Sequence, residues 1–299
     1  MTATAPRLAS DVRALYPFEG RLLRLGCGHR LHYVDEGAGA PLLLLHGNPT
    51  WSFHYRELVL GLRDRYRCIA PDHVGCGLSD KPPDWSYRVA AHADNVAELI
   101  ERLDLRRLTL VTHDWGGPIG YLAALRSPER IARLVTFNTA VSLLPLPRAL
   151  TLLRGPLLGP IFIRGLNGLV RAGLIASAAN GRPLERRARA GYLAPYDSWD
   201  HRLAILQFVR EIPLESDHPN RSLLDRVEAA LPGFADRPHL VIWGARDPVF
   251  HGEYLQAWRR RFPDAEVHVL ERAGHWVVEE EAARVLALLR EFLVRTDAA

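Results

Sequence analysis

The chain has 299 residues, 48% of them hydrophobic, which is enough for one large core or two modest ones. Its 38 lysines and arginines against 34 acidic residues leave a formal charge of +4, too small and scattered an excess to indicate a nucleic-acid-binding protein, and no apolar run is long enough to span a bilayer. Residues 1–11 contain no apolar leader, and Cys27, Cys68 and Cys76 lack metal-ligand spacing, so we expect reduced thiols in a cytoplasmic protein.

Short apolar runs that end in turn residues recur along the chain and alternate with amphipathic stretches. The predicted strands are 42–45, 67–70, 108–112, 133–137, 240–243 and 267–270, and the clearest predicted helices are 90–103, 118–125 and 280–294. This alternation is typical of a mostly parallel sheet that is covered by helices on both faces. Because such sheets bind ligands at the carboxyl ends of their strands, the residues that follow each run are the candidates for a site.

The loop His46-Gly47-Asn48-Pro49 follows the first predicted strand. The side-chain amide of Asn48 is a hydrogen-bond donor that this position would direct toward the neighbouring strand ends. The structural alternative is that Asn48 only forms the turn.

A glycine-rich loop from Pro71 to Asp80 follows the second predicted strand. It lacks the Gly-Lys-Ser/Thr ending of a phosphate-binding P-loop, and its glycine spacing differs from the dinucleotide-binding fingerprint. We therefore expect a structural loop that braces the site. No group of metal ligands stands out in the sequence, so we expect neither a metal nor a cofactor.

The segment Leu110-Val111-Thr112-His113-Asp114-Trp115-Gly116-Gly117 places an aspartate where many hydrolases carry a serine. A buried strand, a polar residue, two glycines and a helix make up a nucleophile elbow, a tight turn that exposes one side chain above a sheet. A carboxylate with an ordinary pKa of about 3.9 is ionised at neutral pH and needs no base to activate it. Asp114 is therefore the expected nucleophile, which attacks carbon and forms an ester.

Trp115 follows the expected nucleophile, and its indole N–H can donate a hydrogen bond but not accept one. Together with Asn48 it would hold a leaving halide or a developing carboxylate above Asp114, and the backbone N–H groups of both residues would form an oxyanion hole. The structural alternative is that Trp115 only packs.

About a hundred residues separate Asn138 from the next predicted strand, far more than one crossover helix needs. We predict that residues 139–231 form an inserted helical cap and that residues 1–138 and 232–299 form the core. Residues 141–180 contain Arg148, Arg154, Arg164 and Arg171 but no acidic residue. This stretch packs an apolar face on the core, or lines a channel for a long-chain substrate and rests on a membrane surface through its arginines; both can hold. Its prolines, Pro145, Pro147, Pro156 and Pro160, predict short helices rather than one long one.

Two further residues complete a predicted catalytic triad. His275 follows the last predicted strand and is the expected general base that activates water, and Asp247 follows the strand before it and orients that histidine. Either residue alone is weak evidence, because a histidine after a strand is often structural and Asp247-Pro248 can simply begin a turn. The order nucleophile, acid, histidine is the one expected of this hydrolase architecture.

These motifs resemble the haloalkane dehalogenase branch of the α/β-hydrolase superfamily over nearly the whole chain. The resemblance is carried by His46-Gly47-Asn48-Pro49-Thr50-Trp51, by the elbow around Asp114 and by Gly274-His275. It implies an α/β-hydrolase fold with a mostly parallel eight-stranded sheet and an inserted helical cap. It also implies Asp114 as nucleophile, His275 as base, and Asn48 with Trp115 as the anion-holding pair. Some members carry a glutamate where this chain has Asn138, so the acid role falls to Asp247.

The run from Pro71 to Pro82 is similar to the β-lactone decarboxylases of bacterial long-chain olefin biosynthesis. The expected function is conversion of a cis-3-alkyl-4-alkyloxetan-2-one, an apolar small molecule, to a cis-olefin and carbon dioxide. This resemblance implies assembly with other enzymes of that pathway, and peripheral contact with a membrane is a further expectation. The main alternative is a haloalkane dehalogenase that uses the same five residues. Epoxide hydrolysis ranks third, because the predicted cap offers only Tyr192 and Tyr196 to protonate a ring oxygen. Fluoroacetate dehalogenation would need cations where Trp115 and Gly116 stand, and a non-catalytic scaffold would not need the triad.

Overall fold

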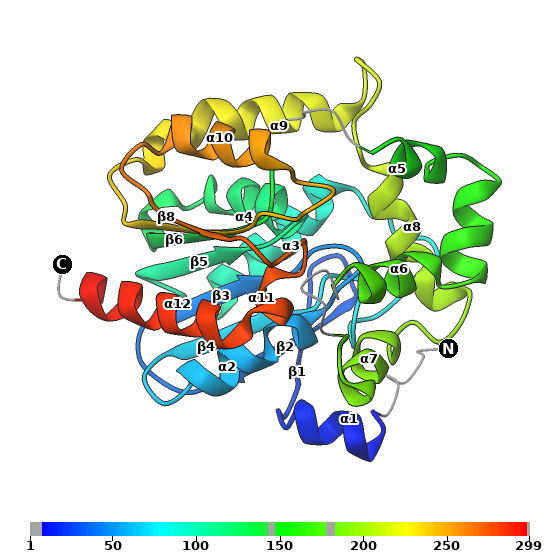
Figure 1. Ribbon diagram of the computed structural model, residues 1–299, viewed down its shortest axis with the longest axis horizontal. Helices are drawn as coiled ribbons and strands as arrows, with labels where there is room; N and C mark the ends of the chain where they lie inside the picture. Colours follow the sequence, from blue (N-terminus) through cyan, green and yellow to red (C-terminus); the bar gives the residue numbers. More distant parts are fainter. Residues whose placement is uncertain (1–7, 141, 143–146, 178–182, 298–299) are drawn as a thin grey trace.

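The computed structural model describes residues 8–140, 142, 147–177 and 183–297, and it contains one eight-stranded sheet (Figure 1). The strand order is β1-β2-β4-β3-β5-β6-β7-β8. The pairs β1–β2 and β2–β4 are antiparallel, and all other neighbours are parallel. The predicted α/β fold with a mostly parallel eight-stranded sheet is therefore confirmed.

The strands are β1 (Arg21–Arg24), β2 (Arg30–Glu36), β3 (Pro41–Leu45), β4 (Arg67–Pro71), β5 (Leu108–Thr112), β6 (Ile131–Phe137), β7 (His239–Gly244) and β8 (Glu266–Leu270). The helices are α1 (Ser10–Leu15), α2 (Arg56–Leu62), α3 (Val89–Arg102), α4 (Gly116–Ala124), α5 (Arg148–Leu153), α6 (Gly168–Ala176), α7 (Arg186–Leu193), α8 (Leu203–Arg210), α9 (Pro219–Ala230), α10 (Gly252–Arg261), α11 (Val277–Glu280) and α12 (Ala282–Asp297). Short helical turns are η1 (Ser52–Tyr55), η2 (Pro128–Arg130), η3 (Pro160–Gly165, a π-helix), η4 (Asp200–Arg202) and η5 (Leu231–Phe234).

The two faces of the sheet bury alternate residues of each central strand. In β3, Leu42 and Leu44 pack into the core cluster shared with α2 and α12, whereas Leu43 and Leu45 pack into the cluster shared with α3, α4 and α10. Successive side chains of a strand point to opposite faces, so a strand that is covered on both sides is apolar throughout. This explains why the central strands were predictable as continuous apolar runs.

All six predicted strands are present, and the structure adds the hairpin β1–β2 at one edge of the sheet. Three of the four β1 residues are exposed, and the strand begins and ends with arginine. An edge strand of this kind carries no apolar run, because only one side of it packs on the core. The predicted helix 280–294 corresponds to α12, which begins at Ala282 and is preceded by the short α11, which ends at Glu280.

The long connection between β6 and β7 forms the helices α5 to α9. Figure 1 shows α5, α6, α7 and α8 gathered at one end of the sheet, whereas α9 lies beside α10. Pro147 and Pro160 stand at the starts of α5 and η3, and Pro156 lies between these elements, as expected of residues that interrupt a helix. Pro145 lies outside the described residues. None of the described helices is both long and apolar enough to cross a bilayer.

Candidate active site

Asp114 stands at the turn between β5 and α4 and has a φ of 51°. Left-handed backbone is uncommon for residues other than glycine and costs energy that the surrounding structure must supply. The N–H of Asp114 donates to the carbonyl of Asn138 at 2.9 Å, and its own carbonyl accepts from the hydroxyl of Thr139 at 2.5 Å. These bonds hold the elbow, so the carboxylate projects beyond the carboxyl end of the sheet.

The glycines after Asp114 allow the start of α4 to pack closely against the end of β3. A Cβ atom on Gly116 would overlap the carbonyl oxygen of Leu45 in β3, and one on Gly117 would overlap the hydroxyl of Thr139. The first obstacle is backbone of a central strand, which cannot move without disturbing the sheet. Close packing therefore requires glycine at position 116.

We expect Gly116→Ala to lower the free energy of unfolding by about 1–3 kcal/mol, because the added methyl group is forced against the backbone of β3. Gly252→Ala is the matched control, since a Cβ atom there has open space and position 252 begins α10. Urea denaturation of both variants measures the difference. Equal stability of the two variants would contradict the packing account.

The carboxylate of Asp114 is almost fully enclosed, with the residue 7% exposed. Burial raises its pKa, while the charge of His275 and hydrogen bonds from the backbone N–H groups of Trp115 and Asn48 oppose that shift. The Asn48 N–H donates to Oδ1 of Asp114 at 2.5 Å. Two backbone donors thus meet at one carboxylate, and they are suited to hold the oxygen of an ester formed there.

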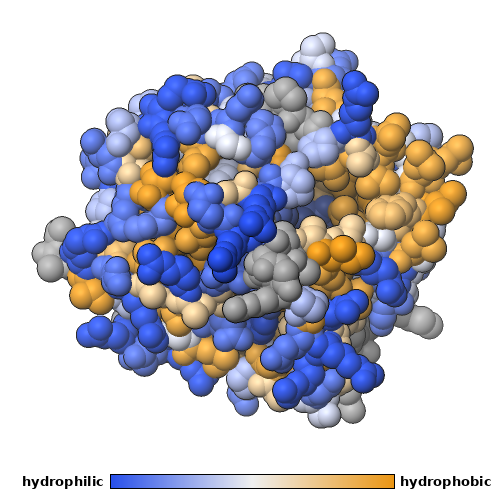
Figure 2. All heavy atoms as spheres, in the orientation of Figure 1, coloured by the Kyte–Doolittle hydropathy of each residue, from blue (hydrophilic) through white to orange (hydrophobic). Residues whose placement is uncertain are grey.

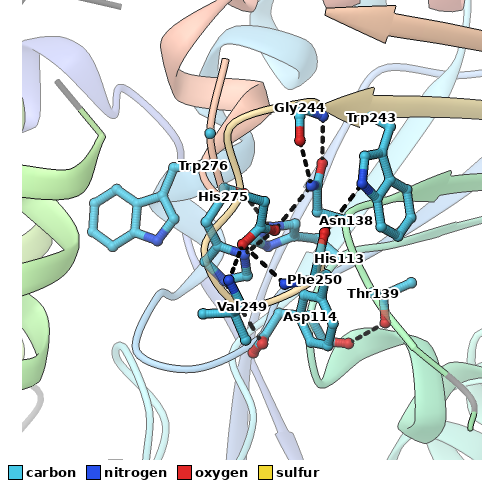
Figure 3. A network of polar contacts seen from close by, with 12 residues as sticks. His113, Asp114, Asn138, Thr139, Trp243, Gly244, Val249, Phe250, His275 and Trp276 are labelled. Carbon is cyan, nitrogen blue, oxygen red and sulfur yellow. Dashed lines mark hydrogen bonds and ion pairs between the residues drawn. The ribbon is translucent and has the colours of Figure 1, made fainter. Parts of the chain in front are cut away.

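His275 lies between Asp114 and Asp247, and Figure 3 shows it close to Asp114. Its Nε2 is 3.7 Å from Oδ2 of Asp114, and its Nδ1 is 2.8 Å from Oδ2 of Asp247. Burial alone would lower the pKa of this imidazole, but Asp247, through its charge and its hydrogen bond, and then Asp114 raise it to about 9. His275 is therefore protonated at neutral pH in the free protein, where Asp247 and Asp114 both carry their charge.

Asp247 is held on all sides by hydrogen bonds. Its Oδ1 accepts from the backbone N–H groups of Val249 and Phe250 at 2.7 and 3.0 Å, and its Oδ2 also accepts from the side-chain amide of Asn138 at 2.9 Å. Although burial opposes ionisation, the charge and hydrogen bond of His275 and the backbone N–H groups of Val249 and Phe250 lower the pKa of Asp247. The same amide of Asn138 bonds both the carbonyl and the N–H of Gly244, so it ties β6 to β7 beneath the site.

The role of Asn138 in positioning Asp247 was not predicted from the sequence. The sequence did contain a signal for this role. Asn138 directly follows β6, and Asp247 lies shortly after the neighbouring strand β7. Two further contacts, from His113 and Glu280, fix the His275 loop. His113 donates from Nε2 to the carbonyl of His275 at 2.8 Å, and Glu280 accepts from the N–H groups of Gly274 and Trp276.

We expect Asp247→Asn to lower the pKa of His275 from about 9, because it removes the largest contribution that raises this pKa and leaves burial less opposed. NMR titration of the imidazole measures this, with the signal assigned by its loss in His275→Gln. Asp264→Asn, an exposed aspartate, is the control that leaves the titration in place. An unchanged pKa in Asp247→Asn would show that Asp247 does not set the charge of His275.

The side chains of Asn48 and Trp115 both line the cavity above Asp114. The side-chain amide nitrogen of Asn48 donates one hydrogen bond, to the carbonyl of Ile205 in α8 at 3.2 Å, and it is the backbone N–H of Asn48 that donates to Asp114. The indole of Trp115 is half-buried and lies near the ring of Phe208, 5.8 Å between centroids. In the described part of the chain, no residue accepts a hydrogen bond from this indole N–H.

A cavity of about 420 Å³ opens above Asp114. Asp114 and His275 line it together with Tyr254, and most of the other lining side chains are apolar and come from α5, η3, α6, α8 and α9, among them Leu150, Phe162, Leu169, Val209 and Leu224. The structure thus brings four of the five sequence-predicted residues to one apolar cavity and places the fifth, Asp247, behind His275. Such a site suits an apolar substrate that a carboxylate attacks away from water.

Comparison with known proteins agrees with this arrangement. Residues 40–282 match the family described as alpha/beta hydrolase fold. A protein of Shewanella oneidensis named cis-3-alkyl-4-alkyloxetan-2-one decarboxylase is 41% identical over 292 residues, which cover 95% of this chain and 91% of that protein. Haloalkane dehalogenase 2 of Mycobacterium bovis is 34% identical over 285 residues, covering 93% of this chain and 96% of that protein. The crystal structure of a haloalkane dehalogenase from Agrobacterium tumefaciens C58 superposes with a TM-score of 0.84 at 26% identity, covering 93% of this chain and 97% of the other.

Proposed function

The chain belongs to the α/β-hydrolase fold family, in its haloalkane dehalogenase-like branch, and from this premise we propose that it is a β-lactone decarboxylase acting through Asp114. The observation that carries the proposal is the apolar cavity built over a single attacking carboxylate, together with 41% identity to a decarboxylase against 34% to a dehalogenase. The substrate class is a cis-3-alkyl-4-alkyloxetan-2-one, whose alkyl chains match the lining of the cavity. Residues 139–231 are the cap that encloses these chains.

In the first step, Asp114 attacks C4 of the lactone, the alkyl-substituted ring carbon that is bonded to the ring oxygen, rather than the carbonyl carbon. Oδ1 is held by the N–H of Asn48, so Oδ2, which faces His275, is the attacking atom. A new bond forms between Oδ2 and this carbon, the ring carbon–oxygen bond breaks, and its electrons go to a free carboxylate. The indole N–H of Trp115 lies in the same cavity to receive this carboxylate.

In the second step, the electrons of the bond to the carboxylate carbon form the olefin double bond while Asp114 leaves with its own electron pair. Carbon dioxide is released, and neither water nor a proton is consumed. Attack inverts the ring carbon, and an anti elimination then reverses the effect of that inversion on the olefin geometry. A cis-lactone therefore gives a cis-olefin.

His275 stabilises the charge that returns to Asp114 in the second step. As an imidazolium 3.7 Å from Oδ2, it favours departure of this carboxylate from the alkyl ester. Asp247 maintains this protonated state and the ring orientation through the bond to Nδ1.

The experiment that tests this function gives the purified protein a long-chain cis-β-lactone and, in parallel, a panel of bromoalkanes. Olefin and bromide are both quantified. Olefin with little bromide is the expected result, and bromide without olefin would overturn the proposal.

Haloalkane dehalogenation is the second candidate because it uses the same residues. Here the carboxylate of Asp114 displaces halide, and a neutral His275 then activates water against the ester. Loss of the Asp114 charge on ester formation removes one of the contributions that raise the pKa of His275, which makes this base role feasible. Epoxide hydrolysis is less favoured, since the hydroxyls of Tyr192 and Tyr196 are buried in bonds to Glu279 and the carbonyl of Thr50.

A further inference from the structure

The outer surface of the cap carries a concentration of exposed hydrophobic side chains. Nine large hydrophobic residues are exposed in the described part of the chain, and six of them lie between α5 and the end of α6. We call these six the apolar ridge: Leu152 (62% exposed), Leu157 (73%), Leu158 (56%), Ile161 (58%), Leu166 (62%) and Ile175 (73%). Single exposed hydrophobic residues are ordinary, but a cluster of this kind marks an interaction surface.

The ridge is continuous along the backbone. The N–H of Ile161 donates to the carbonyl of Leu157, and the N–H of Leu166 donates to the carbonyl of Ile161, so these three residues lie one helical turn apart on one face. The turn η3 contacts both α5, which carries Leu152, and α6, which carries Ile175. Figure 2 shows hydrophobic residues gathered over this region, whereas hydrophilic residues dominate most of the rest of the face in view.

The same elements are apolar on their inner side as well. Leu153 of α5, Phe162 of η3 and Leu169 of α6 line the cavity above Asp114. A helical element that is apolar on both sides needs a second apolar partner besides the core of its own protein. The elements that carry the ridge therefore also form part of the cavity wall.

The charges around the ridge favour an anionic partner. Residues 141–180 contain four arginines and no acidic residue. Arg154 and Arg164 pair with Glu215 and Asp200, whereas Arg148 and Arg171 are exposed on α5 and α6 themselves. Arg164 also stacks on Trp199, 46% exposed, at 4.4 Å from the ring centroid, and tryptophan with arginine is a side-chain pair typical of lipid–water interfaces.

We propose that the apolar ridge docks this protein peripherally on an anionic lipid membrane. A second copy of the chain is a poorer occupant, because a two-fold interface would place the arginines of one ridge opposite those of the other. Anionic headgroups instead neutralise Arg148 and Arg171 while the leucines and isoleucines enter the acyl boundary. Docking in this way would place the cavity wall against the phase in which long-chain lactones dissolve. The docking itself does not depend on the proposed reaction.

The test is co-sedimentation of the full chain with two kinds of vesicle. One contains phosphatidylcholine and phosphatidylglycerol at a ratio of about 7:3, which gives the vesicle a negative surface charge, and the other contains phosphatidylcholine alone. We expect binding to the anionic vesicles that weakens at high salt. The triple variant Leu157→Ser, Ile161→Ser, Leu166→Ser is expected to lower the partition coefficient at least about tenfold. Leu22→Ser with Val294→Ser is the matched control, because these residues are 53% and 51% exposed and lie outside the ridge.

A second pair of variants tests how much the exposed arginines of α5 and α6 contribute to membrane binding. Arg148→Gln with Arg171→Gln should weaken binding to anionic vesicles only, whereas Arg259→Gln with Arg260→Gln, on the exposed part of α10, should not. Equal binding by the wild type and the triple variant would overturn the proposal. A second result would also overturn it: the wild type does not bind vesicles, and sedimentation velocity without vesicles shows an oligomeric wild type but a monomeric triple variant. The ridge would then be a contact between copies of the chain. Product assays in detergent solution report on the reaction separately, so failure of one proposal is distinguishable from failure of the other.

Discussion

Replacing Asp114 by asparagine is expected to lower kcat/KM for the β-lactone by at least about 10⁴-fold, since the amide cannot attack the ring carbon. The expected loss of activity is this large because the carboxylate of Asp114 forms the new bond in the first step and leaves in the second. Olefin formation under single-turnover conditions measures the loss. Residual activity within tenfold of wild type would remove Asp114 from the role of nucleophile.

Asparagine is the suitable replacement because the backbone at position 114 is left-handed. Asparagine adopts such a φ more easily than alanine does, so Asp114→Asn separates loss of chemistry from loss of fold. Asp104→Asn is the matched control, because Asp104 also has a positive φ of 44° but lies on the surface in ion pairs with Arg106 and Arg130. Both variants should keep the wild-type thermal transition, and intact mass should confirm that the amide persists.

The second large effect is expected from His275→Gln, which should slow olefin formation by about 10²–10⁴-fold, the range typical of a lost proton-bearing group. Dehalogenation and decarboxylation differ in the enzyme-bound intermediate that accumulates in His275→Gln. A bromoalkane should leave a stable alkyl ester on Asp114, visible by mass spectrometry, because no group activates water. The lactone adduct should still fragment slowly, since that step consumes no water.

The pH profile gives the same prediction a second readout. If the imidazolium is the active form, wild-type olefin formation stays constant at neutral pH and falls as the pH rises through about 9, where His275 loses its proton. This alkaline limb should be absent in His275→Gln and present in His268→Gln, a half-buried histidine paired with Glu266. A rate that instead rises through pH 9 would mean that neutral His275 acts as a base, as in ester hydrolysis.

Much of the fold was predictable because the central strands are buried on both faces. Runs such as Leu108–Thr112 are apolar throughout, and the turn residues that follow them mark the carboxyl ends where the site lies. The hairpin β1–β2 escaped prediction, because Arg21–Arg24 lies at an edge and offers no apolar run. Glu281, which separates α11 from α12, lies in an otherwise helical pattern and gives no local sign of the break.

The candidate site was predictable as a set of residues but not as a geometry. Their order in the chain and their positions after predicted strands indicated that Asp114, Asp247 and His275 form one triad. The destination of the Asn48 amide depends on where α8 places the carbonyl of Ile205, a contact between residues far apart in the sequence. The positive φ of Asp114 agrees with the tight turn predicted at the elbow, whereas the approach of Gly116 to the carbonyl of Leu45 in β3 is a contact between residues far apart in the sequence.

The central claim is that the ester on Asp114 breaks down by carbon–carbon cleavage rather than by hydrolysis. The most direct measurement is reaction of a cis-β-lactone with the wild-type protein in ¹⁸O-labelled water, with all organic products identified. The account predicts a cis-olefin equivalent in amount to the lactone consumed and no β-hydroxy acid. β-Hydroxy acid formed faster than in a protein-free control would contradict it, because hydrolysis of the ester on Asp114 releases this acid. Over repeated turnovers its hydroxyl would carry ¹⁸O that water delivers through the carboxylate of Asp114.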